Sequence, residues 1–246
     1  MINSEFQWQS AFQTDKGNVR QFNEDAVLSR DDIQLWAVAD GMGGHEAGDI
    51  ASQLIMSGLN QLSYHNDLSN YVDSVDDSLI NSNQELRLLG RDKYNNHTIG
   101  STVVCMVSVG RYIAYLWAGD SRIYRIRDRS IKQLTRDHSE VQNMVDQGLL
   151  LPEEAEAHPA ANVITRAIGA ADSLFASVGV EEVLDGDIYL MCSDGLYRDI
   201  SDQEFLKVGQ QDDVNKICTD LMQLALSREG KDNITTIILN STATSD

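Results

Sequence analysis

Five aspartates, each beside its own short apolar run, constrain this chain more than any other feature. They lie in the segments NED-AV, LWAVAD-GMGG, YLWAGD-SR, YLMCSD-GL and KD-NITTIIL, as Asp25, Asp40, Asp120, Asp194 and Asp232. A single aspartate at a strand end usually forms a turn or caps a helix. Five strand ends that converge on one rim would instead gather carboxylates that only a cation can neutralise. The pattern therefore predicts a site for a hard metal ion.

The apolar patterns around these aspartates predict an α+β fold. Strands are expected at residues 5–13, 26–29, 33–39, 102–109, 112–118, 122–127, 131–134, 176–180, 187–192 and 233–239. Helical spacing of apolar residues predicts helices over residues 50–62, 68–86, 139–148 and 212–227. We interpret the four strands between 102 and 134 as an antiparallel meander. A surface flap is expected at about 139–170, irregular from 149 onward, where both prolines occur.

Length and charge limit the number of domains and the kinds of partner. No Gly/Ser-rich or Pro-rich linker divides the 246 residues, so we predict a single domain over 1–246, as a monomer. The net charge of −19 argues against nucleic acid and anionic membranes, which bind through Lys and Arg. No signal peptide and no membrane-spanning run is visible, so we expect a cytoplasmic protein without membrane insertion. The three cysteines lie in apolar runs and are expected to be buried, reduced thiols.

Six short motifs between about Asp15 and Leu239 follow one another in an order that resembles a known family. They are R-x-x-N-E-D, V-A-D-G-M-G-G-H, G-S-T, G-D-S-R, S-D-G-L and D-N-I-T. In this order and spacing they resemble the type 2C family, the metal-dependent protein serine/threonine phosphatases, in its bacterial form. The resemblance implies a four-layer α-β-β-α sandwich, in which helix pairs flank two antiparallel sheets and the metals lie at one end.

The resemblance also implies which residues hold two Mn²⁺ or Mg²⁺ ions. The implied metal ligands are Glu24, Asp25, Asp40, Gly41, Asp120, Asp194 and Asp232. Asp40 would bridge the two ions, with the Gly41 carbonyl on one of them, while Asp194 and Asp232 would hold one ion. Asp25 and Glu24 would serve the pair, partly through bound water. Asp120, together with Asp194, matches the place where relatives hold a third, weaker ion.

The chemistry of these residues agrees with that assignment. A ligand set of oxygen atoms with several retained waters suits Mg²⁺ or Mn²⁺, whereas zinc would favour His and Cys. Two ions roughly 3.5–4 Å apart can share one water and lower its pKa, so that the hydroxide attacks phosphorus in line. Arg20 precedes the carboxylates, and a guanidinium binds phosphate bidentately; the family uses this arginine to hold the substrate phosphate.

Other polar residues in the motifs have simpler interpretations. Ser101 and Ser193 show no sequence sign of a His-Asp relay, so we expect packing or hydrogen bonding rather than nucleophilic attack. Arg122 is expected to form a local ion pair. Asn23 and Asn233 are expected to shape turns beside the ligands.

One position departs from the family pattern. Many eukaryotic members carry a histidine directly after the Asp-Gly of the second motif and use it as a general acid. This chain has Met42 there, which cannot donate a proton. His45 could compensate, although a structural role fits it as well, and metal-bound water is an equal alternative. The identity of the acid stays open.

The predicted function is hydrolysis of phosphoserine and phosphothreonine in phosphorylated proteins. By resemblance, a cognate serine/threonine kinase would supply these substrates. A first alternative is a non-catalytic phosphoprotein-binding regulator on the same fold. A second is a regulator of the sporulation or stress-response type that dephosphorylates one dedicated partner.

Overall fold

Two antiparallel sheets form the centre of the computed structural model, which describes residues 5–43, 46–95, 97–211 and 213–244. The five-stranded sheet has the order β1 (Phe6–Asp15), β11 (Ile234–Ala243), β10 (Ile188–Cys192), β7 (Arg122–Arg127) and β8 (Ser130–Gln133). The six-stranded sheet has the order β2 (Asp25–Arg30), β3 (Leu35–Met42), β5 (Val103–Val109), β6 (Tyr112–Ala118) and β9 (Ser177–Glu182), with β4 (Gly100–Ser101) beside β3.

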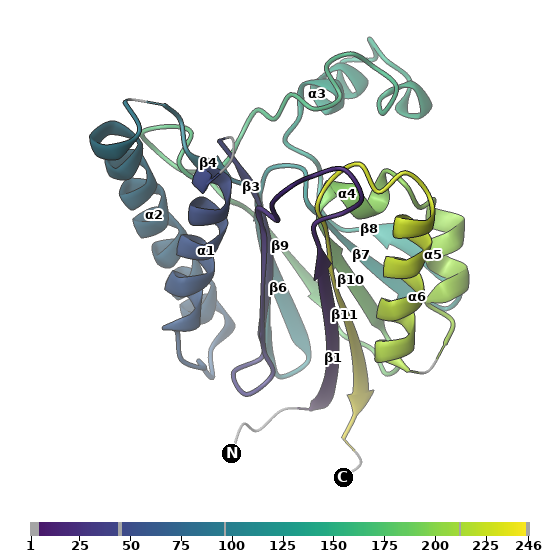
Figure 1. Ribbon diagram of the computed structural model, residues 1–246. Coiled ribbons are helices and arrows are strands. Elements are labelled where there is room, and N and C mark those ends of the chain that lie inside the picture. The colour runs from purple at the N-terminus through teal and green to yellow at the C-terminus, as the bar shows by residue number, and fades with distance from the viewer. Residues whose placement is uncertain (1–4, 44–45, 96, 212, 245–246) are drawn as a thin grey trace.

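Helices cover the outer face of each sheet (Figure 1). The six-stranded sheet packs against α1 (Glu46–Asn60) and α2 (Leu68–Lys93). The five-stranded sheet packs against α4 (Asp194–Tyr197), α5 (Asp202–Val208) and α6 (Val214–Ser227). The predicted four-layer α+β sandwich is confirmed. No helix within the described ranges is both long and apolar enough to cross a membrane.

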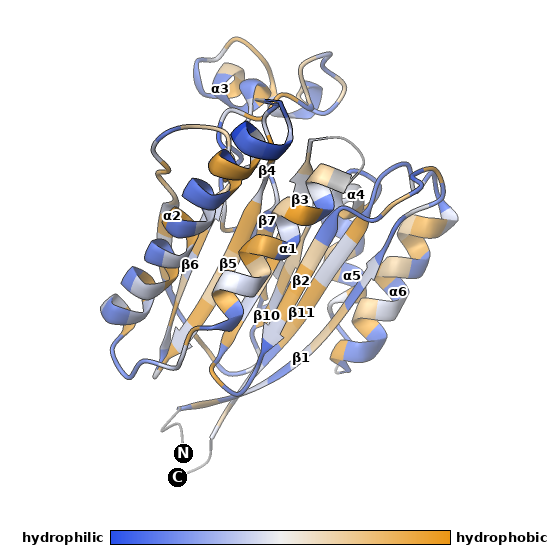
Figure 2. Cartoon of the chain, turned by 60° about the vertical axis from the view of Figure 1, so that its left-hand side comes forward, coloured by the Kyte–Doolittle hydropathy of each residue, from blue (hydrophilic) through white to orange (hydrophobic). Residues whose placement is uncertain are grey.

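Large aromatic side chains fill the space between the two sheets. Trp8 of β1 lies 5.1 Å from Trp36 of β3 and 5.8 Å from Tyr189 of β10, measured between ring centroids. The strand period of two sends alternate residues of β1 inward, so Trp8 is buried while its neighbours are exposed. Figure 2 shows that the strands inside the sandwich are largely hydrophobic, whereas α2 and α6 carry both hydrophobic and hydrophilic residues. The three cysteines are buried and free, as expected.

The sequence predicted strands better than it predicted their connections. The strands expected at 112–118 and 122–127 appear with those bounds as β6 and β7. The expected meander is wrong, because β6 pairs with β5 and β9 whereas β7 pairs with β8 and β10 in the other sheet. The break at Gly119-Asp120 is therefore a crossover between sheets and not a hairpin turn. The short helices α4 and α5 were not predicted.

The segment 139–170 lies above the sandwich, at the end where β3, β6 and β10 finish (Figure 1). It begins with α3 (Glu140–Asp146), continues through a 3₁₀ turn at Pro152–Glu154, and returns to the sheet edge at Ile168. Ser139 caps α3 by accepting a hydrogen bond from the Gln142 amide. We call residues 139–170 the flap segment; that it works as a flap stays a prediction.

Candidate active site

All five aspartates of the sequence pattern lie at one end of the sandwich. Asp25 begins β2 and lies opposite Asp40 in the register of β3. Asp194 is the first residue of α4, directly after β10, and Asp232 comes just before β11. Asp120 lies in the crossover between β6 and β7. The charges of the other four all raise the pKa of Asp40, so the fold brings together carboxylates that are distant in sequence.

Burial and mutual repulsion raise the pKa of four of these carboxylates, those of Asp25, Asp40, Asp120 and Asp194. Burial raises the pKa of Asp25 to about 7, and hydrogen bonds from Thr235 and Ser193 only partly oppose it. Burial likewise raises the pKa of Asp120 to about 7, and the charge of Asp194 adds to the rise. The pKa of Asp40 lies well above its usual range for the same two reasons. The group therefore needs a positive charge before it can be fully ionised.

Two carboxylate oxygens in this group fit a cation. Asp25 Oδ1 and Asp194 Oδ1 are buried and accept no hydrogen bond from any described residue. Buried acceptors without a donor require an explanation, and a divalent cation with oxygen ligands supplies one. In the described ranges, however, no three His, Cys, Asp or Glu side chains form a complete ligand set around one point. A sparse set of this kind suits Mg²⁺ or Mn²⁺, which retain several waters.

The G-S-T motif holds the backbone of Asp40. The Ser101 hydroxyl donates to the Asp40 carbonyl at 2.8 Å, and the Thr102 amide donates to the same oxygen at 2.9 Å. The Asp40 amide donates back to Thr102 Oγ1, which also bonds the hydroxyl of Ser121. These contacts confirm that Ser101 serves hydrogen bonding, and they connect three of the six motifs physically.

Ser193 has a similar supporting role. Its hydroxyl donates to Asp25 Oδ2 at 2.7 Å and accepts from the Thr235 amide at 3.0 Å. Both bonds are buried, and they tie the end of β10 to β2 and β11. The predicted hydrogen-bonding role is confirmed for this serine too.

Asn233 fixes the loop that carries Arg20 and Glu24. Its side chain donates to the carbonyls of Lys16 and Phe22, and it accepts from the Glu24 amide at 2.8 Å. Gly17 has φ +76°, and a Cβ at this position would lie 2.1 Å from the Asp232 carbonyl oxygen, so only glycine fits. The loop is therefore held directly against the chain around Asp232.

Asn23 shapes the turn at the end of the same loop. Its side chain donates to Thr14 Oγ1 and accepts from the Asp25 amide. The expected turn-forming role of Asn23 is thus confirmed, whereas Asn233 holds the loop beside the metal-ligand candidates through long-range hydrogen bonds.

Arg20 points toward the carboxylates although its side chain is 53% exposed. Its Nη2 lies 2.7 Å from Asp232 Oδ2, and this hydrogen bond is the main reason that its pKa is raised. A guanidinium has five N–H donors, so a single bond to Asp232 leaves donors for a phosphate. The geometry suits an arginine that holds an anion beside the metal-ligand candidates.

Helix α1 approaches the site closely through two glycines. The Gly41 amide donates to the Glu24 carbonyl at 3.2 Å, and a Cβ on Gly41 would lie 2.1 Å from the Gly48 carbonyl oxygen. Met42 ends β3 beside this contact and is partly exposed. His45, the alternative proton donor, lies outside the described residues.

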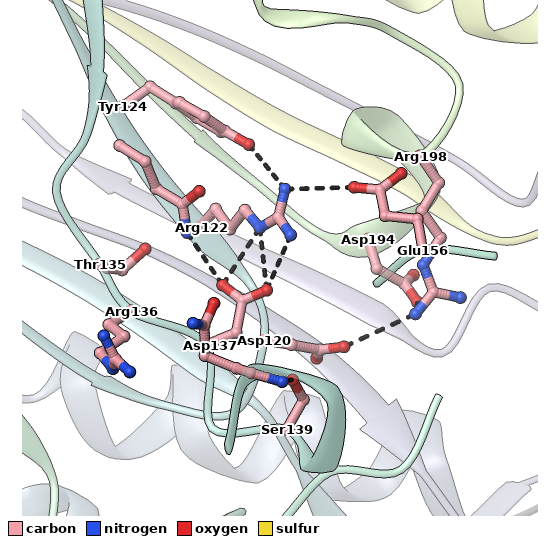
Figure 3. A network of polar contacts seen from close by, with 12 residues as sticks. Asp120, Arg122, Tyr124, Thr135, Arg136, Asp137, Ser139, Glu156, Asp194 and Arg198 are labelled. Atoms are coloured by element: carbon pink, nitrogen blue, oxygen red, sulfur yellow. Dashed lines mark hydrogen bonds and ion pairs between the residues drawn. The ribbon is translucent and has the colours of Figure 1, made fainter. Parts of the chain in front are cut away.

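Sequence reasoning missed the part that Arg198 plays in this site. Its Nη2 lies 3.1 Å from Asp194 Oδ2 and 3.7 Å from Asp120 Oδ2 (Figure 3). The spacing of four residues between Asp194 and Arg198 on a helical turn was the available signal. Nothing in the sequence connected this arginine with Asp120.

Arg122 forms the local ion pair that was predicted for it. Its guanidinium makes two-pronged hydrogen bonds to Asp137 and lies 3.6 Å from the centre of the Tyr197 ring. It also contacts Glu156 of the flap segment at 3.6 Å (Figure 3). The Asp137 carboxylate is nearly buried. This pair connects β7 to the residues just before the flap segment.

Comparison with known proteins identifies the family. The family described as Protein phosphatase 2C matches residues 4–143, which is more than half of the chain. The chain belongs to the protein phosphatase 2C family. It is thereby placed among the metal-dependent protein serine/threonine phosphatases, and the resemblance drawn from the six motifs is confirmed.

Two bacterial relatives illustrate the relationship. The protein phosphatase PhpP of Streptococcus pneumoniae is 35% identical over 237 residues, covering 92% of this chain and 95% of PhpP. The serine/threonine protein phosphatase PstP of Mycobacterium tuberculosis is 34% identical over 228 residues, covering 93% of this chain. The chain spans only 44% of the length of PstP.

Solved structures of the protein phosphatase 2C family share the fold and inform on metal content. PppA, described as a key regulatory component of T6SS in Pseudomonas aeruginosa, has a TM-score of 0.89 at 37% identity, covering 95% of this chain and 97% of PppA. The catalytic domain of PstP in complex with two manganese ions has a TM-score of 0.86 at 33% identity, covering 96% and 98%. A relative with this fold therefore binds two manganese ions.

Proposed function

We propose that this protein phosphatase 2C hydrolyses phosphoserine and phosphothreonine in proteins, using two Mn²⁺ or Mg²⁺ ions. The proposed ligands of the two ions are Glu24, Asp25, Asp40, Gly41, Asp194 and Asp232. The observation that carries the proposal is the group of buried carboxylates with two unpaired oxygens, placed beside an exposed arginine. The manganese-bound relative supports the choice of metal.

Each group of the chain has a defined task in this proposal. Two ions held by these ligands would lower the pKa of a shared water and neutralise charge on the phosphate. Arg20 orients the phosphate, and its bond to Asp232 keeps the guanidinium at the edge of the carboxylate group. Asn233 and the G-S-T motif hold Glu24 and Asp40 in place. Met42 cannot protonate the leaving oxygen, so the proton donor lies elsewhere.

The wider assignments are part of the same proposal. Residues 1–246 act as one monomeric catalytic domain, with 139–170 as a flap beside the site. The contacts of Arg122 with Glu156 and of Arg198 with Asn162 support a flap that communicates with the metal ligands. The substrates are phosphorylated proteins, including those of a cognate serine/threonine kinase. The family resemblance implied a third, weaker ion at Asp120 and Asp194, but the guanidinium of Arg198 already lies there.

Hydrolysis of a phosphothreonine peptide in the presence of Mn²⁺ tests this function. Asp40→Asn should lower kcat/KM by more than about 100-fold, which exceeds the loss that supporting residues usually cause. Asp92→Asn makes the same charge change at an exposed site that pairs with its neighbour Arg91, and should keep full activity. Full activity of Asp40→Asn would overturn the mechanism. Tight peptide binding by the unaltered protein without hydrolysis would favour the non-catalytic alternative.

A further inference from the structure

The guanidinium of Arg198 occupies the space between two carboxylates of the site. It lies directly after α4 and reaches back to Asp194 Oδ2 at 3.1 Å and across to Asp120 Oδ2 at 3.7 Å (Figure 3). The Arg198 side chain is 30% exposed, whereas those of Asp120 and Asp194 are only 6% and 13% exposed. A permanent cation of the chain is thus inserted between two nearly buried anions.

These two carboxylates need a positive charge. Burial raises the pKa of Asp120 and Asp194, and each is close to further acidic groups. The positive charge of Arg198 lowers the pKa of both aspartates, and it does so more strongly than any other charge that acts on them. An arginine keeps its proton at any physiological pH, so this compensation is always present.

A divalent ion does not fit the same place while Arg198 is there. An ion held by both carboxylates would lie beside the guanidinium that already contacts their Oδ2 atoms, and the two cations would repel each other at short range. The residues present therefore disagree with the third metal position that the family resemblance implied for Asp120 and Asp194.

The flap segment holds Arg198 from the other side. Arg198 Nη1 donates to Asn162 Oδ1 of this segment. Next to it, the ring of Tyr197 covers Arg122, which in turn contacts Glu156 of the same segment. Two consecutive residues after Leu196 thus connect the carboxylates to the flap segment.

We propose that Arg198 is a positioning residue that supplies, in place of a third metal ion, the positive charge between Asp120 and Asp194, and that Asn162 holds it there. The inference rests on the proposed two-ion function. It has two consequences: the protein takes up two divalent ions and no third, and the flap segment loosens when the guanidinium is removed.

Counting bound Mn²⁺ per chain on the full-length protein, by electron paramagnetic resonance up to millimolar Mn²⁺, tests the first consequence. We expect two ions for the unaltered protein and for Arg198→Lys, which keeps the charge. Arg198→Ala should bind three, and the added Asp120→Asn should return the count to two. Arg111→Ala, which removes a surface arginine paired with Glu182, should leave the count at two.

The outcomes separate the inference from the proposed function. Three ions in the unaltered protein, or two in Arg198→Ala, would overturn the role of Arg198 while leaving the two-ion site intact. No bound Mn²⁺ in the unaltered protein would overturn both. If Arg198→Ala does not fold, Arg198→Gln decides in its place, because it keeps a hydrogen-bond donor of similar length without the charge.

Hydrogen exchange tests the second consequence. Amides of residues 155–165 should exchange about tenfold faster in Arg198→Ala and Asn162→Ala, the factor expected from losing one charge-assisted hydrogen bond. The same amides should be unchanged in Arg111→Ala. Unchanged exchange in both site variants would show that the flap segment is held independently of Arg198.

Discussion

His138 shows how one side chain outside the carboxylate group supports the site. Its Nδ1 accepts a hydrogen bond from the Gly119 amide at 3.2 Å, and Nε2 lies 3.0 Å from Ser177 Oγ. The imidazole stacks on Trp117 with an angle of 7° between the planes. Gly119 is the residue before Asp120, so His138 holds the crossover that places this carboxylate.

This histidine should make the protein sensitive to acid. Burial, and then the charge of Arg166, lower the pKa of His138 from 6.5 to about 4. In the unfolded chain His138 therefore binds a proton below pH 6.5, whereas in the folded protein it binds one only below about pH 4. His138 thus contributes stability at neutral pH that is lost as the pH falls through this window. His138→Gln should remove that part of the pH dependence of the Tm.

Thermal unfolding at pH 7 and pH 5 measures the effect. The Tm at pH 5 minus the Tm at pH 7 should be more positive in His138→Gln than in the unaltered protein, because the acid-sensitive contribution of His138 is gone. His65→Gln is the matched control, because His65 packs beside Tyr71 at the opposite helix pair. An equal difference between the two Tm values in His138→Gln and in the unaltered protein would contradict the assignment.

At the scale of elements, the position of α1 depends on its contact with the end of β3. A methyl group on Gly41 would meet the Gly48 carbonyl oxygen at 2.1 Å and the Glu24 carbonyl oxygen at 2.6 Å. These neighbours are backbone atoms, so they cannot move without shifting α1 at Gly48 and the loop at Glu24. Gly41→Ala should lower the free energy of unfolding by about 1–3 kcal/mol, as overpacking does. It should also weaken metal binding, because the added methyl group pushes directly against the backbone of Glu24.

Denaturant unfolding and Mn²⁺ titration measure these two effects. Gly58→Ala is the matched control within α1, since its Cβ would meet only the movable hydroxyls of Ser78 and Ser82 at 3.0 and 3.2 Å. That change should alter stability by less than about 1 kcal/mol, because alanine also improves helix propensity. Equal destabilisation by both substitutions would contradict the importance of the Gly41 contact.

Elements were predictable where one physical pattern dominated the local sequence. Strand β6 is almost wholly buried, and β7 combines buried apolar residues with partly exposed arginines, so the apolar pattern of each strand is visible in a few residues. The crossover between them was not predictable, because Gly119-Asp120 reads like a hairpin turn and the choice of sheet depends on distant strands. Helix α4 has four residues and α5 seven, which is too short for helical periodicity to be recognised.

The residues of the candidate site also fall into those that the sequence predicts and those that it does not. The aspartates were predictable because each lies in a short motif whose order in the chain carries the resemblance. Arg198 was missed because its partner Asp120 is far away in sequence and comes close only through the packing of α4 against the crossover. The links made by Asn233 were seen only as a turn, since their partners Lys16 and Phe22 lie at the other end of the chain.

At the scale of the whole molecule, a net charge of −19 is combined with one concentrated group of carboxylates. Most acidic residues are spread over the surface, where water and salt screen them. The site differs because its carboxylates are buried together, so their repulsion is weakly screened. The folded state without metal therefore carries an electrostatic cost at this end of the sandwich, and that cost depends on pH.

Metal should consequently stabilise the protein more at high pH than at low pH. The folded pKa of Asp25 and of Asp120 is about 7, above the ordinary value of 3.8. Their contribution to stability is full below pH 3.8 and is lost as the pH rises through about 7 in metal-free protein. Mn²⁺ binds the deprotonated carboxylates, so its affinity increases over the same range.

The difference in Tm between Mn²⁺-loaded and EDTA-treated protein measures this coupling. It should be larger at pH 8 than at pH 5.5, and one site at a Mn²⁺ concentration a hundredfold above its Kd adds about 2.7 kcal/mol. Asp25→Asn should make the EDTA-treated protein more stable at pH 8 and reduce the gain from Mn²⁺, because it removes both the repulsion and a ligand. A Tm difference that is independent of pH would mean that cations other than Mn²⁺, such as Arg20 and Arg198, already neutralise the carboxylates.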